Sequence, residues 1–106
     1  MNNETILMSA IWYKELKSIK SDLPTSHYLP KNIQYGLVMY GLRHAQCIYT
    51  RFAIMGTSDY QCGESVQGFL TTHNRFLTRE EAAILHTNNG GTLKYSTTQL
   101  FSEDLY

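Results

Sequence analysis

Two segments of the sequence combine basic side chains with the expected start of a helix. Arg43 and His44 open the first expected helix, and Arg75 and Arg79 lie on either side of Thr78, which is expected to cap the second. The start of a helix presents unpaired backbone amides and a partial positive charge, and a guanidinium adds two parallel donors for phosphate oxygens. These residue types in this arrangement indicate a pocket for a phosphate-bearing ligand.

The same residues also have a simpler interpretation, and the sequence leaves both open. Arginine at a helix start opposes the helix dipole, and either a bound anion or an acidic neighbour would offset that cost. Glu80 and Glu103 are candidate neighbours that would form ordinary surface ion pairs. Phe69, on an expected hairpin, either offers a ring on which a base stacks or belongs to the hydrophobic core.

His44 and Cys47 lie three residues apart on the first expected helix, a spacing that could pair a base with a nucleophile or supply two metal ligands. The other cysteine and the other histidines show no paired spacing. No third residue is identified that would orient His44. We therefore expect no metal, no cofactor and no catalytic residue, and we interpret Cys47 as a small, half-buried helix residue.

The composition describes one small domain without an excess of charge. The chain has 106 residues, 42% of them hydrophobic, and nine Lys and Arg balance nine Asp and Glu. This length supports a single core, so we expect residues 1–106 to form one domain. A neutral chain has no broad basic face for DNA. Because there is no apolar run of about 18 residues and no basic leader, we expect an intracellular protein that does not enter membranes.

The first part of the chain predicts two strands joined by a long connection. Within residues 5–14, the nearly continuous apolar run at residues 6–13 is typical of a central strand covered on both faces. Residues 33–41 alternate between apolar and other side chains and predict a second, antiparallel strand ending at Gly41. Residues 15–31, which are rich in Lys and Ser and contain both prolines, predict a long exposed connection.

The rest of the chain predicts two helices and a hairpin. A helix is expected over residues 44–55, with an apolar face formed by Ala45, Ile48, Phe52 and Met55. Residues 66–77 predict a hairpin, after which Thr78 and Glu81 form the capping box of a second helix. The fold class is therefore α+β, a small antiparallel sheet packed with two helices. The apolar residues at the C-terminus are expected to pack on this domain.

Several motifs resemble those of a family of small phage proteins, the sponge type of Thoeris anti-defence protein. The motifs are Gly41-Leu42-Arg43-His44, Gln67-Gly68-Phe69-Leu70, residues 74–82 and the C-terminal Leu100-Phe101-Ser102-Glu103-Asp104-Leu105-Tyr106, and the resemblance spans residues 10–106. Proteins of that family bind the cyclic ADP-ribose isomer made by an activated bacterial TIR-domain protein and do not cleave it. Some also hold cyclic oligonucleotides of CBASS defence at a separate site.

The resemblance implies a non-enzymatic protein that sequesters such a cyclic nucleotide in the cytoplasm of the infected bacterium. It implies a homodimer or a larger assembly such as a hexamer, with pockets between protomers, and a Phe69 ring that stacks on the base. The segment before Leu100 has no arginine, so a basic contact from this region either falls to Lys94 or is absent. The expected ligand-binding residues are Arg43, His44, Phe69, Arg75, Thr78, Arg79 and Lys94.

Two other functions remain open at the level of the sequence. One is an enzyme that degrades the same nucleotide, for which His44 with Glu103 or Asp104 is the candidate acid–base group. The other is an inhibitor that binds a defence protein directly, because eight Tyr residues suit a protein interface.

Overall fold

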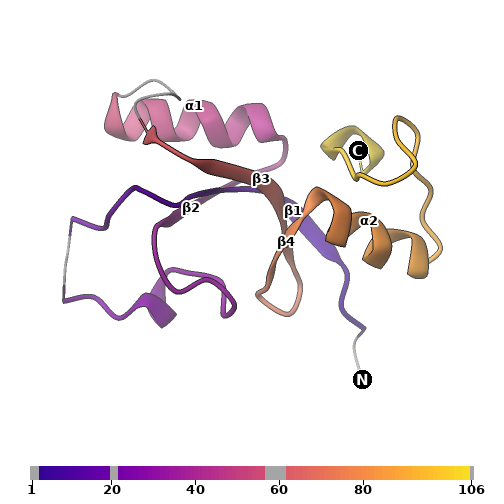
Figure 1. Ribbon diagram of the computed structural model, residues 1–106, viewed down its shortest axis with the longest axis horizontal. Helices are drawn as coiled ribbons and strands as arrows, with labels where there is room; N and C mark the ends of the chain where they lie inside the picture. Colours follow the sequence, from indigo (N-terminus) through magenta and orange to yellow (C-terminus); the bar gives the residue numbers. More distant parts are fainter. Residues whose placement is uncertain (1–2, 20–21, 57–61, 106) are drawn as a thin grey trace.

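The computed structural model describes residues 3–19, 22–56 and 62–105 (Figure 1). Four strands form one antiparallel sheet in the order β2-β1-β3-β4. The strands are β1 (Ile6–Tyr13), β2 (Leu37–Gly41), β3 (Ser65–Thr71) and β4 (Phe76–Thr78). The helices are α1 (His44–Met55) and α2 (Arg79–Asn88), with short 3-10 turns η1 (Thr25–His27) and η3 (Ser102–Asp104). This architecture confirms the predicted α+β fold.

β1 lies inside the sheet, as its continuous apolar run predicts. Ile11 of β1 stands opposite Met39 of β2 and opposite Gln67 of β3. Residues directly opposite each other in neighbouring strands point to the same face of a sheet. The register therefore places Gln67 on the same face as Ile11.

Both helices pack on the face of the sheet to which Ile11 points. One cluster on this face joins Ile11 and Tyr13 of β1 to Cys47 of α1. A second cluster joins Phe69 of β3 to Ala82 and neighbouring residues of α2 and the C-terminal segment. Because the strands alternate their side chains between faces, the polar Gln67 lies among these helix-facing positions.

The long connection covers the opposite face of the sheet. The prediction of an exposed segment over residues 15–31 is correct for residues 22–27, but Leu29 and Pro30 are buried, and residues 20–21 lie outside the described residues. Leu29 and Ile33 pack against Ala10 and Val38 of the sheet. The predicted second strand is also shorter than expected, because the chain at Ile33 belongs to this covering segment and pairing begins at Leu37.

Helix α1 has the predicted bounds, but its buried face matches the prediction only in part. It ends at Gly56, whose φ of 68° is a left-handed conformation that glycine adopts without strain. The predicted apolar face is correct only in part. Ile48 packs against the cluster of Ile11, Tyr13 and Cys47, whereas Ala45 is exposed and Phe52 is 52% exposed. His44, Cys47 and Arg51 are buried instead.

The contacts at the start of α1 explain its rotation. β2 leads into the helix after a two-residue connection, and the Ser9 hydroxyl donates to the Leu42 carbonyl over 3.2 Å. The His44 ring lies with Nε2 2.8 Å from the carbonyl oxygen of Gly68 in β3. These polar contacts fix which side of α1 meets the sheet, and this constraint overrides the apolar periodicity.

Helix α2 begins as its sequence predicts. The Glu81 amide donates to the Thr78 hydroxyl over 3.2 Å, and the Thr78 amide donates to the Glu81 carboxylate over 2.9 Å, which completes the capping box. Ala82 and Ala83 are buried, as expected of its apolar face. The C-terminal segment packs on the domain through Leu100, which is fully buried. Within the described ranges, no helix is long and apolar enough to cross a membrane.

Candidate functional site

The start of α1, the start of α2 and the C-terminal turn η3 come together beside β3 (Figure 1). Arg43 is the N-cap residue of α1, and Arg79 is the first residue of α2. Gln67 of β3 lies on the helix-covered face, and its side-chain oxygen accepts a hydrogen bond from Arg79 Nη2. The fold thus brings together two arginines that are 36 positions apart in the chain.

Arg79 is the most constrained cation of this site. Its guanidinium carbon lies 4.6 Å from the centre of the Phe101 ring. Burial lowers the pKa of Arg79, while Glu103 and Glu80 act in the opposite direction. A guanidinium held by an aromatic ring and an amide oxygen has already lost part of its hydration and its rotamer freedom. The entropy cost of ordering Arg79 on binding an anion would therefore be small.

Arg43 faces the same turn from the other helix. Its Nη1 atom lies 3.7 Å from a carboxylate oxygen of Glu103, and the two side chains are 37% and 53% exposed. The Glu103 carboxylate also accepts a hydrogen bond of 3.0 Å from the Ser102 hydroxyl. The turn's own backbone amide and Ser102 lower the pKa of Glu103, and Arg43 and Arg79 lower it further. An exposed ion pair of this length stabilises the fold weakly.

His44 and Phe69 are the buried residues next to the two arginines. The His44 ring is buried and meets the Phe69 ring edge-on, with 5.0 Å between the ring centres. Burial lowers the pKa of His44, so the ring is neutral at neutral pH, and Nε2 carries the proton donated to the Gly68 carbonyl. Phe69 is fully buried, so of its two interpretations the core one describes this structure.

The exposed aromatic surface of the site comes from the C-terminal segment. Tyr95, Phe101 and Glu103 line a pocket of about 340 Å³. The Tyr95 and Phe101 rings meet at 90° with their centres 6.4 Å apart, and Tyr95 is 65% exposed. Lys94 stands next to Tyr95, and its backbone amide donates to Asp104 over 2.7 Å. Lys94 is therefore near the pocket because its chain neighbour Tyr95 lines it.

The remaining two expected residues are engaged in structural contacts. The Thr78 hydroxyl caps α2. Arg75 forms a two-pronged ion pair with Glu4, with Nη2–Oε1 and Nε–Oε2 distances of 2.6 and 2.7 Å. The Arg75 carbonyl pairs with Thr71, four residues along β3 from Gln67, which corresponds to about 13 Å of strand. The fold thus separates Arg75 from the pair formed by Arg43 and Arg79.

The pair formed by Glu4 and Arg75 predicts an acid-dependent loss of stability. The hydrogen bonds from Arg75, with help from Thr71, lower the pKa of Glu4 from 4.5 to about 2 against the effect of burial. A lowered carboxyl pKa stabilises the fold above the unfolded value of 4.5, and this contribution disappears as the pH falls through 2.

We expect Glu4→Gln to reduce the free energy of unfolding by about 2 kcal/mol at pH 7, a figure discounted for the exposure of Arg75. Urea denaturation at a series of pH values would measure this difference. The difference between wild type and variant should shrink toward zero near pH 2. A constant difference across the whole range would show that the charge of Glu4 is not the cause.

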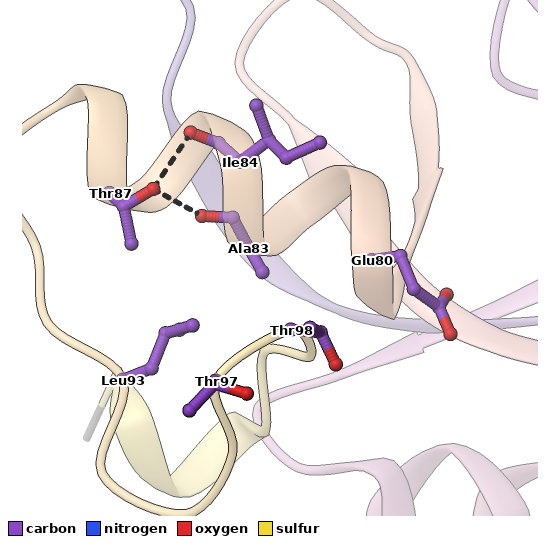
Figure 2. Close-up of a pocket in the computed structure, with 7 residues that line it drawn as sticks. All are labelled: Glu80, Ala83, Ile84, Thr87, Leu93, Thr97 and Thr98. Carbon is purple, nitrogen blue, oxygen red and sulfur yellow. Dashed lines mark hydrogen bonds between the residues drawn. The ribbon is translucent and has the colours of Figure 1, made fainter.

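A second groove lies between α2 and the segment that leads to the C-terminal turn (Figure 2). It has a volume of about 280 Å³ and is lined by Glu80, Ala83, Ile84, Thr87, Leu93, Thr97 and Thr98. The Thr87 hydroxyl donates to the carbonyls of Ala83 and Ile84, so mainly its methyl group is left to face the groove. Among the described residues that line it, Glu80 alone is charged, so these residues offer a phosphate no cation.

The structure gives the candidate nucleophile and base little access to a substrate. Cys47 is fully buried rather than half-buried, and burial raises the pKa of its thiol to about 11. Its sulfur faces the carbonyl oxygens of Ser9 and Arg43. In the part of the chain that the structure describes, no group of three or more His, Cys, Asp or Glu could hold a metal ion.

Sequence reasoning missed three contributors to the site, namely Gln67, Tyr95 and Phe101. Gln67 and Phe69 are two residues apart on one strand and therefore share a face, and this alternation could have placed Gln67 beside the helices. Phe101 belongs to a motif that the sequence singled out, but its contact with Arg79 depends on the path of the C-terminal segment.

Fold and site together define a small α+β protein with two arginines at helix starts and an aromatic pocket beside them. Residues 5–106 match the family model described as phage T4 y16D protein, so the chain belongs to this phage protein family. No curated protein and no solved structure shows a significant match. The match confirms that the chain is of a phage protein type, and its part in Thoeris defence stays a prediction.

Proposed function

We propose that this phage protein binds and sequesters a cyclic nucleotide immune signal of the bacterial host, such as the cyclic ADP-ribose isomer of Thoeris defence, without cleaving it. The observation that carries the proposal is the position of Arg79. Its guanidinium carbon lies 4.6 Å from the centre of the Phe101 ring. Two residues further along the chain, Glu103 contacts Arg43, so both arginines meet the same short segment. A phage protein with this function would act in the cytoplasm of the infected cell.

The chemistry of the pocket fits that class of ligand. A cyclic ADP-ribose carries a pyrophosphate, and Arg43 and Arg79 can each donate two hydrogen bonds to phosphate oxygens. The exposed Tyr95 ring provides a surface on which an adenine can stack. The adenine is therefore assigned to the ring system of Tyr95 and Phe101, in place of Phe69.

A second copy of the chain would complete the site. The pocket of about 340 Å³ lies near the lower limit for small-molecule sites, and one protomer would leave much of a cyclic ADP-ribose exposed to water. This agrees with the homo-oligomer implied by the resemblance. Cyclic oligonucleotides, which carry the same phosphate chemistry, belong to the proposed ligand class as well.

The surroundings of the candidate acid–base groups support binding over hydrolysis. His44 is buried and donates to a backbone carbonyl. The Asp104 carboxylate accepts the backbone amides of Lys94 and Phe101. General acid–base catalysis needs a group within hydrogen-bond reach of the substrate. Glu103 does line the pocket, but its carboxylate accepts a hydrogen bond from Ser102 and lies beside Arg43. Its candidate partner His44 is buried, so tight binding of an unchanged ligand is the activity that fits these groups best.

Release of the ligand after denaturation tests this proposal. The protein is mixed with a cyclic ADP-ribose isomer, separated from unbound nucleotide and then heated. We expect chromatography with mass spectrometry to recover the intact cyclic compound in proportion to the protein, and this ratio also reports how many chains share one site. Recovery of a linear product would support the alternative of an enzyme that degrades the signal.

An inhibitor that contacts a defence protein directly is the second candidate function. It is favoured by the outer side of α1, where Tyr49 and Phe52, three residues apart, are exposed. Adjacent apolar side chains on a helix surface are typical of a protein interface. Isolation of a defence protein bound in stoichiometric amount, together with no change in Tm on addition of cyclic nucleotides, would favour this candidate over sequestration.

A further inference from the structure

The carboxylate of Glu103 lies where a ligand phosphate would meet the two arginines. Glu103 lines the pocket with Phe101, and one of its carboxylate oxygens is 3.7 Å from Arg43 Nη1. Arg79 lies over the ring of Phe101, and Phe101 is two residues before Glu103 in the chain. The charges of Arg79 and Glu103 interact. The protein thus places an anion of its own at this position.

The backbone that carries Glu103 is fixed on both sides. The Leu100 amide donates to the Arg79 carbonyl over 3.0 Å, which ties the segment to the first residue of α2. The Asp104 carboxylate accepts the Phe101 amide over 2.9 Å, and Ser102 is buried. The side chain of Glu103 is 53% exposed, so it can turn toward solvent while the turn stays in place.

Among the residues that the structure describes, four carry charges that act at this position. Arg43 and Arg79 are positive, and Glu103 and Glu80 are negative. His44, which lies beneath them, is neutral at neutral pH. Glu80 lies at the end of the neighbouring groove, where it accepts a hydrogen bond of 3.0 Å from Gln99. Glu103 is therefore the acidic residue that contacts one of the two arginines directly, whereas Glu80 acts on Arg79 from a distance.

We propose that Glu103 is an internal competitor that sets the affinity of the site, because a ligand phosphate must displace its carboxylate from Arg43 before it binds both guanidinium groups. This inference rests on the proposed function. In the free protein, Glu103 offsets the repulsion between the two arginines. When a pyrophosphate binds, it takes over that role with more negative charge, and the Glu103 side chain turns to solvent.

The variant Glu103→Gln tests the inference, since it removes the charge and keeps the size of the side chain. The probe is inorganic pyrophosphate, titrated calorimetrically at low ionic strength and pH 7.5. We expect Glu103→Gln to bind pyrophosphate roughly two- to fivefold more tightly than wild type, which corresponds to the loss of one exposed ion pair. The Tm without ligand should change little, because the pair is exposed.

Glu80→Gln is the matched control. It changes the net charge by the same amount next to Arg79, and we expect it to alter the pyrophosphate affinity less than Glu103→Gln does. An equal gain in both variants would reduce the effect to net charge and overturn the inference. The inference is equally wrong if Glu103→Gln binds pyrophosphate with unchanged or weaker affinity while wild type binds it.

The outcomes separate the inference from the proposed function. Binding by wild type without a gain in Glu103→Gln leaves the proposed function standing and removes the internal competitor. Binding by Glu103→Gln alone supports the competitor and argues against wild type as an effective trap. A lack of binding in both proteins contradicts the anion site itself, and the inference fails with it.

Discussion

Replacing Arg79 with alanine should weaken the binding of a cyclic ADP-ribose isomer by about 10- to 100-fold, the loss expected when charge-assisted hydrogen bonds to a phosphate are removed. Arg79 is already oriented by Gln67 and by the Phe101 ring, so little ordering remains to be done when the ligand arrives. The fold should persist, because Arg79 lies at the first position of α2, where the Thr78 cap is unaffected. Isothermal titration would measure the affinity, and thermal denaturation the stability.

Arg75→Ala is the control for Arg79→Ala, because it removes the other arginine near the start of α2. Arg75 is bound to Glu4 and lies about 13 Å along the sheet from the position of Gln67. We expect this variant to lower the Tm and to leave the ligand affinity of the folded protein unchanged, which is the reverse of Arg79→Ala. Equal affinity of Arg79→Ala and wild type would place the ligand elsewhere on the molecule.

Replacing Gly68 with alanine should have the largest effect on stability, a loss of about 3 kcal/mol, at the upper end of the range for overpacked sites. A β-carbon at Gly68 would lie 2.0 Å from the Leu77 carbonyl oxygen and 2.7 Å from Cζ of Phe76. Gly68 pairs with Thr78 across β3 and β4, so β4 would have to move. The glycine carbonyl also accepts the hydrogen bond from His44.

The displacement would also reach the ligand site, because α2 begins directly after Thr78. Urea denaturation would measure the stability, and a titration of the folded protein the affinity. Gly56→Ala is the control, since its φ is 68° but no atom lies within 4 Å of an added β-carbon. We expect the control to lose about 1 kcal/mol from its backbone conformation alone. A loss in Gly68→Ala no greater than in the control would mean that the close approach of β3 and β4 is not a constraint.

The elements of the fold could be predicted because their signals are local. The apolar run of β1, the capping box at Thr78 and Glu81, and the glycine after Met55 each fix an element within a few residues. The rotation of α1 could not be predicted in this way, because it depends on the contact between His44 and Gly68, 24 residues apart. The same holds for Leu29 and Ile33, whose burial depends on the path of the connection across the sheet.

Two basic residues of the candidate site could be predicted from the sequence, whereas Arg75 lies apart from it and the aromatic residues could not be predicted. Arg43 and Arg79 were indicated because both stand at helix starts, whose position the sequence determines. Phe69 lies on a strand whose inner face is covered by both helices, so its ring is buried. Phe101 contacts Arg79 only because residues 95–105 fold back onto the start of α2, and no local pattern encodes that contact.

Chemical-shift mapping of the arginine side chains tests the central claim most directly. Nε–Hε resonances of Arg43, Arg75 and Arg79 are followed by NMR while a cyclic ADP-ribose isomer is added to the folded protein. The proposal predicts that the Arg43 and Arg79 resonances shift in saturable fashion together with the ring protons of Tyr95 and Phe101, that Arg75 stays unchanged, and that the nucleotide remains cyclic. Unchanged Arg43 and Arg79 resonances at saturating nucleotide, or a linear product in the sample, would contradict it.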